Sequence, residues 1–390
     1  MYRATANKPL ATTITGSLPR PQWFAGNLHG RAFLTAFNGD AVYREQYGDA
    51  VATLIADQVR AGLDIVTDGE MRFDQDIGGR SWFGYPFDRM NGLAPREYGG
   101  DPRQRRGFNG RTSEPADILS EFVDTMRPPQ VTGPVGPGDL QYDAVWKVAQ
   151  RLTAKPVKLG SCCGQMLDFQ AQNRFYKDRR ESVMAFSEAL NSEYHRLADA
   201  GCPVIQIEEP LTRGNAGDPN IPAEFYVEAL NREVRGLRAK TEVWCHTCWG
   251  NPYAQRLHGR PSYKPALKYF GALDVDVVTV EATETAGAEL GEIAAALAPH
   301  QKLCVGVISH RSLQVEMPDE VAALIRTALK HIAPERLVLS SDCGFGRQGV
   351  SRTHAFYKMA AMVRGANIVR RELGLAETPV PASDARFMLG

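Results

Sequence analysis

The sequence predicts an α/β fold, a (β/α)8 TIM barrel, on three observations. Eight short apolar runs recur along the 390 residues, and most are followed by a stretch whose apolar residues have helical spacing. Each run ends in polar or metal-binding residues, while its interior is apolar. No GxGxxG motif follows an early run, which argues against the alternative fold, an open doubly wound sheet. We therefore expect the polar strand ends to converge on one face of a barrel.

The first two predicted strands both end in polar tips. Residues 12–17 are rich in β-branched side chains and end at a Gly-Ser pair before a proline, as a strand entering a loop should. A helix is expected over residues 41–61, where the apolar residues recur at helical spacing. The second strand, residues 63–67, leads into a polar tip that includes Glu70.

Residues 72–130 interrupt the alternation of strands and helices. They are rich in Gly, Pro, Arg and aromatic side chains, and we interpret them as an insertion after the second strand that covers one end of the barrel. Residues 1–390 as a whole are interpreted as a single catalytic barrel, because barrels of this type often exceed the usual domain size. The Arg-rich run within the insertion is expected to be a solvated loop.

Six further strands then alternate regularly with helices. The strands are expected at residues 156–160, 203–207, 242–246, 275–280, 303–308 and 336–340. The clearest helices are expected at residues 181–200, 223–239 and 318–332.

Composition excludes several kinds of partner. The chain is 43% hydrophobic with a formal net charge of zero, so neither nucleic acid nor an anionic membrane surface is indicated. No apolar run approaches the ~18 residues of a membrane span, and the N-terminus lacks the apolar stretch of a signal peptide, which predicts a cytoplasmic protein. The 7 cysteines, an odd number in a large chain, indicate reduced thiols rather than a disulfide framework.

Four side chains at the ends of three predicted strands form a candidate Zn²⁺ site. His246 and Cys248 follow the fifth strand, Glu281 the sixth and Cys343 the eighth. Imidazole and thiolate ligands suit Zn²⁺ better than Mg²⁺ or Ca²⁺. Three anionic ligands would make the metal a poor Lewis acid for carbonyls, but it could still hold an incoming thiol as a nucleophilic thiolate. We expect Glu281 to be the ligand most easily displaced by that thiol.

The same end of the barrel offers further polar groups. His310 ends the seventh strand and is interpreted as a proton donor or hydrogen-bond partner for the reacting group. Glu70 and Glu208 either bind a substrate ammonium group or hold Arg side chains. The alternative for the metal is a closed structural site, but structural zinc sites usually draw on short paired motifs rather than on three separate strands.

Seven short runs, spread over nearly the whole chain, carry a family resemblance. They lie at residues 12–17, 62–70, 127–129, 205–210, 246–248, 280–281 and 341–344. With these runs the chain resembles the cobalamin-independent methionine synthases, specifically their C-terminal catalytic barrel, within the uroporphyrinogen decarboxylase/methionine synthase-like superfamily. The N-terminal barrel of the full-length enzymes is absent, so we expect a short, single-barrel relative.

The resemblance implies a zinc-dependent methyl or other alkyl transfer to a thiol. The default in the family is transfer from methyltetrahydrofolate to homocysteine. By position, the family's zinc ligands fall on His246, Cys248, Glu281 and Cys343, and its proton donor falls on His310. Its homocysteine-binding positions fall on Thr15, Gly16, Ser17, Glu70 and Glu208.

Several positions depart from the family pattern. The family usually has Asp where Glu208 stands, which alters the pocket for the amino-acid end of the substrate. Residues that the family uses around the folate donor are replaced by Asp124, Thr125, Phe169 and Gly214. We therefore predict weak discrimination in favour of polyglutamylated folate.

Two other functions remain open from the sequence. One resembles the epoxyalkane:coenzyme M transferases, in which a zinc-bound thiolate opens an epoxide and a sulfonate tail replaces the amino acid. The other is a non-catalytic thiol- or zinc-binding barrel, which would need a closed metal site and no acceptor pocket.

Overall fold

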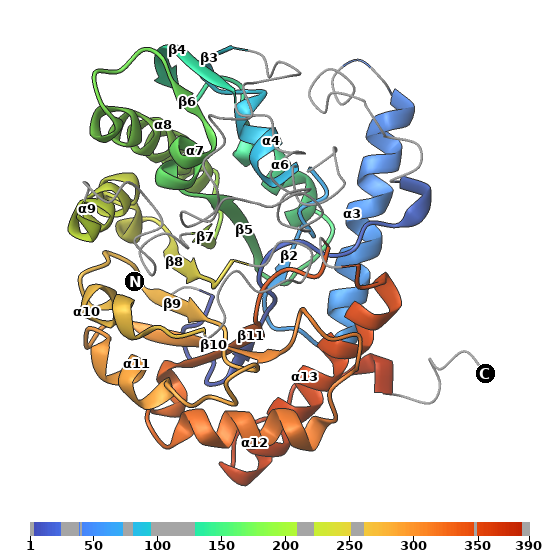
Figure 1. The fold of residues 1–390 in the computed structure, drawn as a ribbon. Helices are drawn as coiled ribbons and strands as arrows, with labels where there is room; N and C mark the ends of the chain where they lie inside the picture. Colours follow the sequence, from blue (N-terminus) through green and yellow to red (C-terminus); the bar gives the residue numbers. More distant parts are fainter. Residues whose placement is uncertain are drawn as a thin grey trace, which may run out of the picture.

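The computed structural model of the chain describes residues 4–24, 39, 41–72, 81–94, 129–208, 222–250, 261–346 and 349–383, without the side chains of residues 81 and 82. Eight strands in these ranges form one sheet of parallel neighbours, surrounded by helices (Figure 1). They are β1 (Ala11–Thr12), β2 (Val66–Thr67), β5 (Val157–Cys162), β7 (Val204–Glu208), β8 (Glu242–Thr247), β9 (Val277–Val280), β10 (Lys302–Ile308) and β11 (Leu337–Ser341). Each of the eight predicted strands has a counterpart, but the first two are placed differently from the prediction. Strand β1 ends at Thr12, where the predicted strand 12–17 was expected to begin, and β2 covers only the last two residues of the predicted strand 63–67.

The two ends of this sheet meet. The strand order is β1-β11-β10-β9-β8-β7-β5-β2, so β1 and β2 are the outermost strands. The backbone N–H groups of Asp64 and Ile65, just before β2, both donate to the carbonyl oxygen of Thr12 in β1 at 3.0 Å. The Asp64 carboxylate in turn accepts the Thr12 N–H at 3.0 Å. The sheet is closed by these bonds, which confirms the predicted (β/α)8 barrel.

The barrel interior is a packed core. One buried cluster takes a side chain from most of the barrel strands: Ala4, Ala11, Ile65, Val204, Trp244, Val277, Cys304 and Val338. Where the strands begin, the Glu242 carboxylate accepts the backbone N–H groups of Ala4 and Thr5 at 3.0 and 3.1 Å. The N-terminal segment therefore lies across that end of the barrel, and the polar strand tips lie at the other end.

Helices lie around the outside of the barrel in Figure 1. They are α3 (Ala41–Ala61), α6 (Tyr142–Gln150), α8 (Arg179–Asp199), α9 (Ala223–Glu233), α10 (Leu267–Phe270), α11 (Leu290–Ala296), α12 (Pro318–Leu329) and α13 (Arg352–Glu372). The predicted helices are confirmed, although α9 and α12 end earlier than expected. Helices α8 and α13 begin at side-chain caps, since Asp178 accepts the N–H of Glu181 and Ser351 that of His354.

A second, three-stranded sheet lies outside the barrel, near the labels β3, β4 and β6 in Figure 1. It consists of β3 (Asn91–Ala94), β4 (Gln130–Gly136) and β6 (Gln172–Asn173), with α4 (Ser81–Phe87) and α7 (Gly164–Gln170) nearby in sequence. Strand β4 starts where the predicted insertion was expected to end. Residues 73–80 and 95–128, which include the Arg-rich run, lie outside the described residues, so the insertion as a cover for one barrel end stays a prediction.

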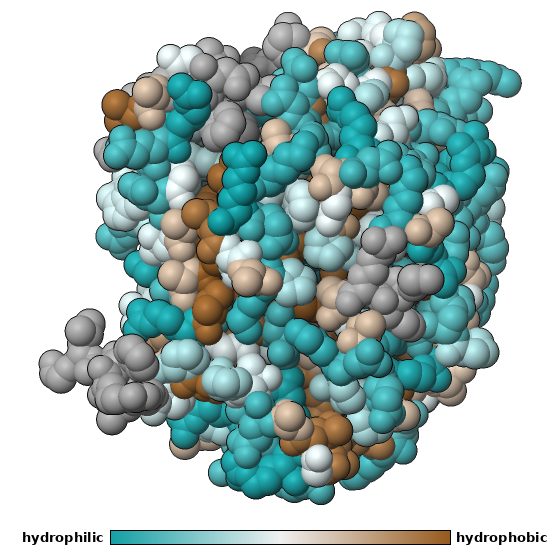
Figure 2. Space-filling view, turned by 180° about the vertical axis from the view of Figure 1, so that it is seen from behind, coloured by the Kyte–Doolittle hydropathy of each residue, from teal (hydrophilic) through white to brown (hydrophobic). Residues whose placement is uncertain are grey.

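Hydrophilic residues predominate on the face shown in Figure 2, where apolar residues occur in small groups. Within the part of the chain that the structure describes, no helix is both long and apolar enough to cross a membrane.

Candidate metal centre

Barrel geometry brings the predicted metal ligands to one end of the molecule. His246 is the fifth residue of β8, and Cys248 comes directly after that strand. Glu281 follows β9 at once, and Cys343 lies two residues beyond β11. Because neighbouring strands run parallel, these four positions share the C-terminal face of the barrel, where active sites of this fold lie.

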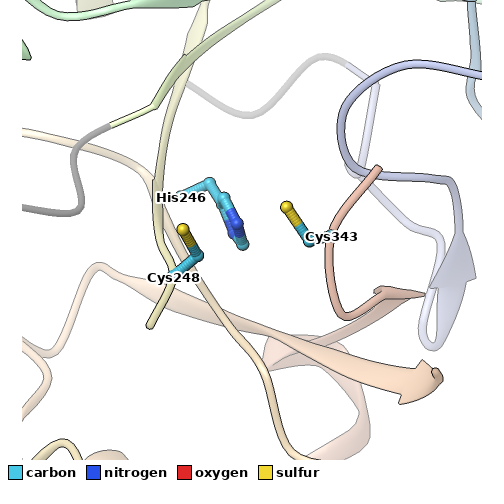
Figure 3. Close-up of side chains that lie close together, drawn as sticks. All are labelled: His246, Cys248 and Cys343. Carbon is cyan, nitrogen blue, oxygen red and sulfur yellow. The ribbon is translucent and has the colours of Figure 1, made fainter. Parts of the chain in front are cut away.

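Three of these side chains converge. One ring nitrogen of His246 and the two sulfur atoms of Cys248 and Cys343 all lie within 4.8 Å of one another. Figure 3 shows Cys343 facing His246 and Cys248 across a small gap, with Cys343 on the turn after β11, His246 in β8 and Cys248 directly after β8. His246 and Cys343 are buried, and Cys248 is partly exposed. These three residues are called the His-Cys-Cys cluster below.

The charges of the cluster call for a cation. Burial lowers the pKa of His246. The negative charge of Glu208, the hydrogen bond with Cys343 and the charges of Cys343 and Glu281 outweigh burial and raise that pKa to about 9. The hydrogen bond with the Cys248 thiol, and then burial, raise the pKa of Cys343 well above its ordinary value. A nitrogen and two sulfurs so arranged fit a Zn²⁺ ion, which would satisfy the imidazole and stabilise both thiolates.

Glu281 lies next to the cluster rather than in it. Its carboxylate belongs to a second group, in which one ligand atom each of Glu281, His310 and Asp342 lie within 4.8 Å of one another. Glu281 Oε1 accepts the backbone N–H of Trp249 at 3.1 Å, and Oε2 lies 3.4 Å from Nη1 of Arg311. The role of Glu281 as a fourth zinc ligand therefore stays a prediction.

Asp342 ties the turn that carries Cys343 to the loop that carries Glu281. Its Oδ1 accepts the backbone N–H groups of Ala282 and Thr283 at 2.8 and 3.3 Å, and its Oδ2 accepts the Thr283 hydroxyl. Burial raises the pKa of Asp342 to about 6, against the hydrogen bonds from Thr283 and Ala282, which lower it. The sequence analysis did not select Asp342, although it stands beside the predicted ligand Cys343.

His310 is buried at the end of β10, in the group with Glu281 and Asp342. It thus lies near the predicted fourth ligand and outside the His-Cys-Cys cluster. This position fits a residue that serves the reacting groups without holding the metal, and that role stays a prediction.

The tip after β1 packs against the turn that carries Cys343. The N–H of Thr15 donates to Ser341 Oγ at 3.0 Å, and the carbonyl oxygen of Ser17 accepts the N–H of Phe345 at 2.8 Å. Gly16 has φ +70°, and a Cβ there would lie 2.8 Å from the Cα of Gly344, so only glycine fits this contact. The predicted substrate-binding segment is thus held beside a predicted metal ligand.

Glu70 sits on a tight turn after β2. Its φ of 57° is unusual for a side-chain-bearing residue, and its N–H donates to Asp68 Oδ1 at 2.9 Å. Arg72 holds the same turn through Asp68 at 3.0 Å and through the carbonyl oxygen of Gly160. A Cβ at Gly160 would lie 3.1 Å from Glu70 Oε1, so the Glu70 carboxylate lies against β5.

Glu208, the last residue of β7, faces His246. Its Oε2 lies 3.6 Å from Nε2 of His246, and its Oε1 accepts the side-chain amide of Gln206 at 2.6 Å. Gln206 was not selected from the sequence. Its spacing of two residues from Glu208 on a strand, which places both on one face, was a usable signal.

The positions predicted to surround a folate donor are mostly outside the described residues. Asp124, Thr125 and Gly214 lie there, whereas Phe169 is placed in α7, with the guanidinium carbon of Arg179 5.7 Å from the centre of its ring. All 7 cysteines are free thiols, as composition predicted.

Comparison with known proteins decides the family. A family model described as "Cobalamin-independent synthase, Catalytic domain" matches residues 106–367, more than half of the chain. The chain belongs to this family. The resemblance read from the sequence is confirmed, and so is the expectation of a methyltransferase enzyme, which fits the family.

Individual relatives of this family member cover nearly its whole length. It is 28% identical over 387 residues to the methionine synthase of Thermococcus kodakarensis, covering 95% of this chain and 97% of the relative. It is 27% identical to the methionine synthase of Saccharolobus solfataricus, and the match covers 93% of this chain and 96% of the relative. The solved structure of a B12-independent methionine synthase from Shewanella sp. W3-18-1, in complex with selenomethionine, matches with a TM-score of 0.71 at 24% identity. The match covers 94% of this chain and 99% of that structure. That last match supports the fold alone.

Proposed function

We propose that the protein transfers a methyl group to the sulfur of homocysteine, with Zn²⁺ bound by the His-Cys-Cys cluster. The observation that carries the proposal is the convergence of His246, Cys248 and Cys343 at the C-terminal end of a barrel of the cobalamin-independent synthase family. The relatives are named methionine synthases, and homocysteine is the thiol that becomes methionine when its sulfur is methylated. The side chains around the cluster suit such an amino-acid thiol.

The bound Zn²⁺ would keep the substrate sulfur deprotonated and nucleophilic at neutral pH. One nitrogen and two sulfur ligands from the protein leave room for a further ligand, as catalytic zinc sites require. Glu281, which is bonded to Trp249 and close to Arg311, is the side chain expected to alternate with the substrate sulfur.

Two buried carboxylates suit the substrate's ammonium group. Glu208 and Glu70 are 5% and 4% exposed, so they are little screened by water and would attract a positive charge strongly. At the tip after β1, the Ser17 hydroxyl is buried and makes no hydrogen bond to the described residues, so it is available to donate to the substrate carboxylate. These residues would orient homocysteine with its sulfur toward the cluster.

The transfer itself needs one proton. A bond forms between the sulfur and the methyl carbon, the bond from that carbon to the donor nitrogen breaks, and the nitrogen takes a proton as it leaves. We assign this proton to His310, which lies beside the cluster in a water-poor position.

The two alternative functions are less well supported. A coenzyme M substrate would place a sulfonate next to Glu208 and Glu70, where like charges repel in a poorly solvated site. A non-catalytic zinc barrel would not need the carboxylates and the histidine that surround the cluster.

The test is methyl transfer by the zinc-loaded protein from methyltetrahydrofolate to homocysteine, measured as methionine formed. We expect turnover by the wild type and by Cys304→Ser, a control in the buried barrel core. We expect loss of both zinc and turnover in Cys343→Ser, because a soft ligand is removed. Turnover in Cys343→Ser equal to that of the wild type would contradict the proposal.

A further inference from the structure

A chain of buried polar groups runs through the barrel interior to Glu208. It starts at Lys158 in β5, whose Nζ donates to Oε1 of Gln206 at 2.5 Å. Gln206 Nε2 donates to Oε1 of Glu208 at 2.6 Å, and Oε2 of Glu208 lies 3.6 Å from His246. All four residues are at most 5% exposed, so water does not compete with these bonds.

The ammonium group of Lys158 determines which way the Gln206 amide points. An ammonium group has donors only, so Gln206 must present its oxygen to Lys158. The amide nitrogen of Gln206 must then face Glu208, which can only accept. Lys158 thus fixes, through one intermediate side chain, a hydrogen bond donated to Glu208.

This bond orients the Glu208 carboxylate. Oε1 is held by Gln206, while Oε2 is beyond hydrogen-bonding distance from His246 and remains able to accept from a ligand. The same Lys158 ammonium also donates to the carbonyl oxygen of Ile14 at 2.7 Å. Ile14 precedes Thr15, so one buried cation holds both the tip after β1 and the Glu208 carboxylate.

We propose that Lys158 and Gln206 are positioning residues that orient Glu208 toward the α-amino group of the thiol substrate, and so give the site its preference for an amino-acid thiol. The inference rests on the proposed function for the identity of that substrate. It assigns the selectivity to residues that do not touch the substrate, because Lys158 and Gln206 act through Glu208 and the β1 tip.

The closing experiment measures thiol binding to the zinc-loaded protein by titration calorimetry. The two probes are homocysteine and 4-mercaptobutanoate, which has the same thiol and carboxylate but no α-amino group. The variants are Gln206→Met, Lys158→Met and the double variant Gln206→Met/Lys158→Met. Gln206→Met alone leaves the buried Lys158 ammonium without its amide partner, and the double variant removes both groups together. The matched control is Lys302→Met, since Lys302 is a buried lysine near the strand starts that donates to the carbonyl oxygen of Thr5 at 2.9 Å.

We expect Gln206→Met and the double variant to bind homocysteine about 10–100-fold more weakly, the usual effect of losing a hydrogen bond to a charged group. Their affinity for 4-mercaptobutanoate should stay within about 3-fold of the wild type, because that probe makes no use of Glu208. Lys158→Met should also weaken the binding of homocysteine more than that of 4-mercaptobutanoate. The control Lys302→Met should leave both affinities unchanged. The zinc content should stay equal in all proteins.

Three results would overturn the inference. The first is an equal loss of affinity for both thiols in the Gln206→Met and double variants, which would indicate general damage to the site. The second is a wild-type protein that binds both probes equally, and the third is a set of variants that keep the wild-type preference for homocysteine. If neither probe binds the wild-type zinc protein, the proposed function fails instead, so the two failures are distinguishable.

Discussion

Arg311 and Glu281 form an ion pair beside the His-Cys-Cys cluster, with 3.4 Å between Nη1 and Oε2. Glu281 is fully buried, and the same guanidinium also pairs with Glu284. Because Glu281 Oε1 is bonded to the N–H of Trp249, both oxygens of this carboxylate are directed to protein groups. In this arrangement the Glu281 carboxylate lies in the group with His310 and Asp342, outside the His-Cys-Cys cluster.

Arg311→Gln should weaken thiol binding. Without its cationic partner, the Glu281 carboxylate gains from approaching a bound Zn²⁺ and competes with the incoming sulfur. We expect homocysteine to bind about 10-fold more weakly to the zinc-loaded variant, measured by calorimetry. Arg311→Lys, which keeps the charge, should bind nearly as well as the wild type. Equal affinity in the wild type and Arg311→Gln would show that Arg311 does not control Glu281.

His310→Asn should slow turnover while retaining the metal. Its zinc content and homocysteine affinity are expected to match the wild type, whereas kcat should fall by roughly 10²–10⁴, the usual range for a general acid. His331→Asn, at an exposed position on the outside of the barrel, is the control. Normal turnover by His310→Asn would mean that the proton comes from another group.

The fold was predictable from the sequence because each barrel strand is a short apolar run that ends in polar residues. The convergence of His246, Cys248 and Cys343 followed from the fold alone, since parallel strands in a barrel place their ends together. The position of the Glu281 carboxylate did not follow from the fold. It depends on the side chain of Arg311 and on the backbone N–H of Trp249, and no sequence motif marks either contact. Lys158 was missed for a similar reason, as a lysine in a strand usually indicates a solvated face rather than a barrel interior.

The stability of the protein should depend on Lys158 in alkaline solution. Burial lowers the pKa of Lys158 to about 8, although Cys304, Glu208 and Glu70 oppose this shift. Between about pH 8 and the ordinary lysine pKa, the unfolded chain binds a proton that the folded protein has lost. Stability relative to Lys158→Met should therefore rise with pH in that window, by about 3 kcal/mol in total. The check is the free energy of unfolding of both proteins, measured from pH 7.5 to about 10.5. If the difference between the two proteins stays constant over this range, the burial of a charged Lys158 is contradicted.

The preference for polyglutamylated folate should be weak. Asp124 and Thr125 replace residues that the family uses around this donor, and an acidic side chain repels a polyanion. We expect kcat/KM for methyltetrahydrofolate with three glutamates to stay within about 3-fold of that with one. Phe169→Trp should improve both donors alike through a larger stacking face. A clear preference of the wild type for the triglutamate would show that other residues, such as the Arg-rich run, bind the tail.

The most direct test of the metal centre is X-ray absorption at the zinc edge, recorded before and after addition of homocysteine. The protein as isolated should contain one Zn²⁺ with two sulfur ligands at about 2.3 Å and the remainder nitrogen or oxygen. Homocysteine should add a third sulfur at a similar distance, and Cys248→Ser should lose most of the metal. A zinc shell that keeps the same number of sulfur ligands when homocysteine is bound would contradict activation of the thiol at the His-Cys-Cys cluster.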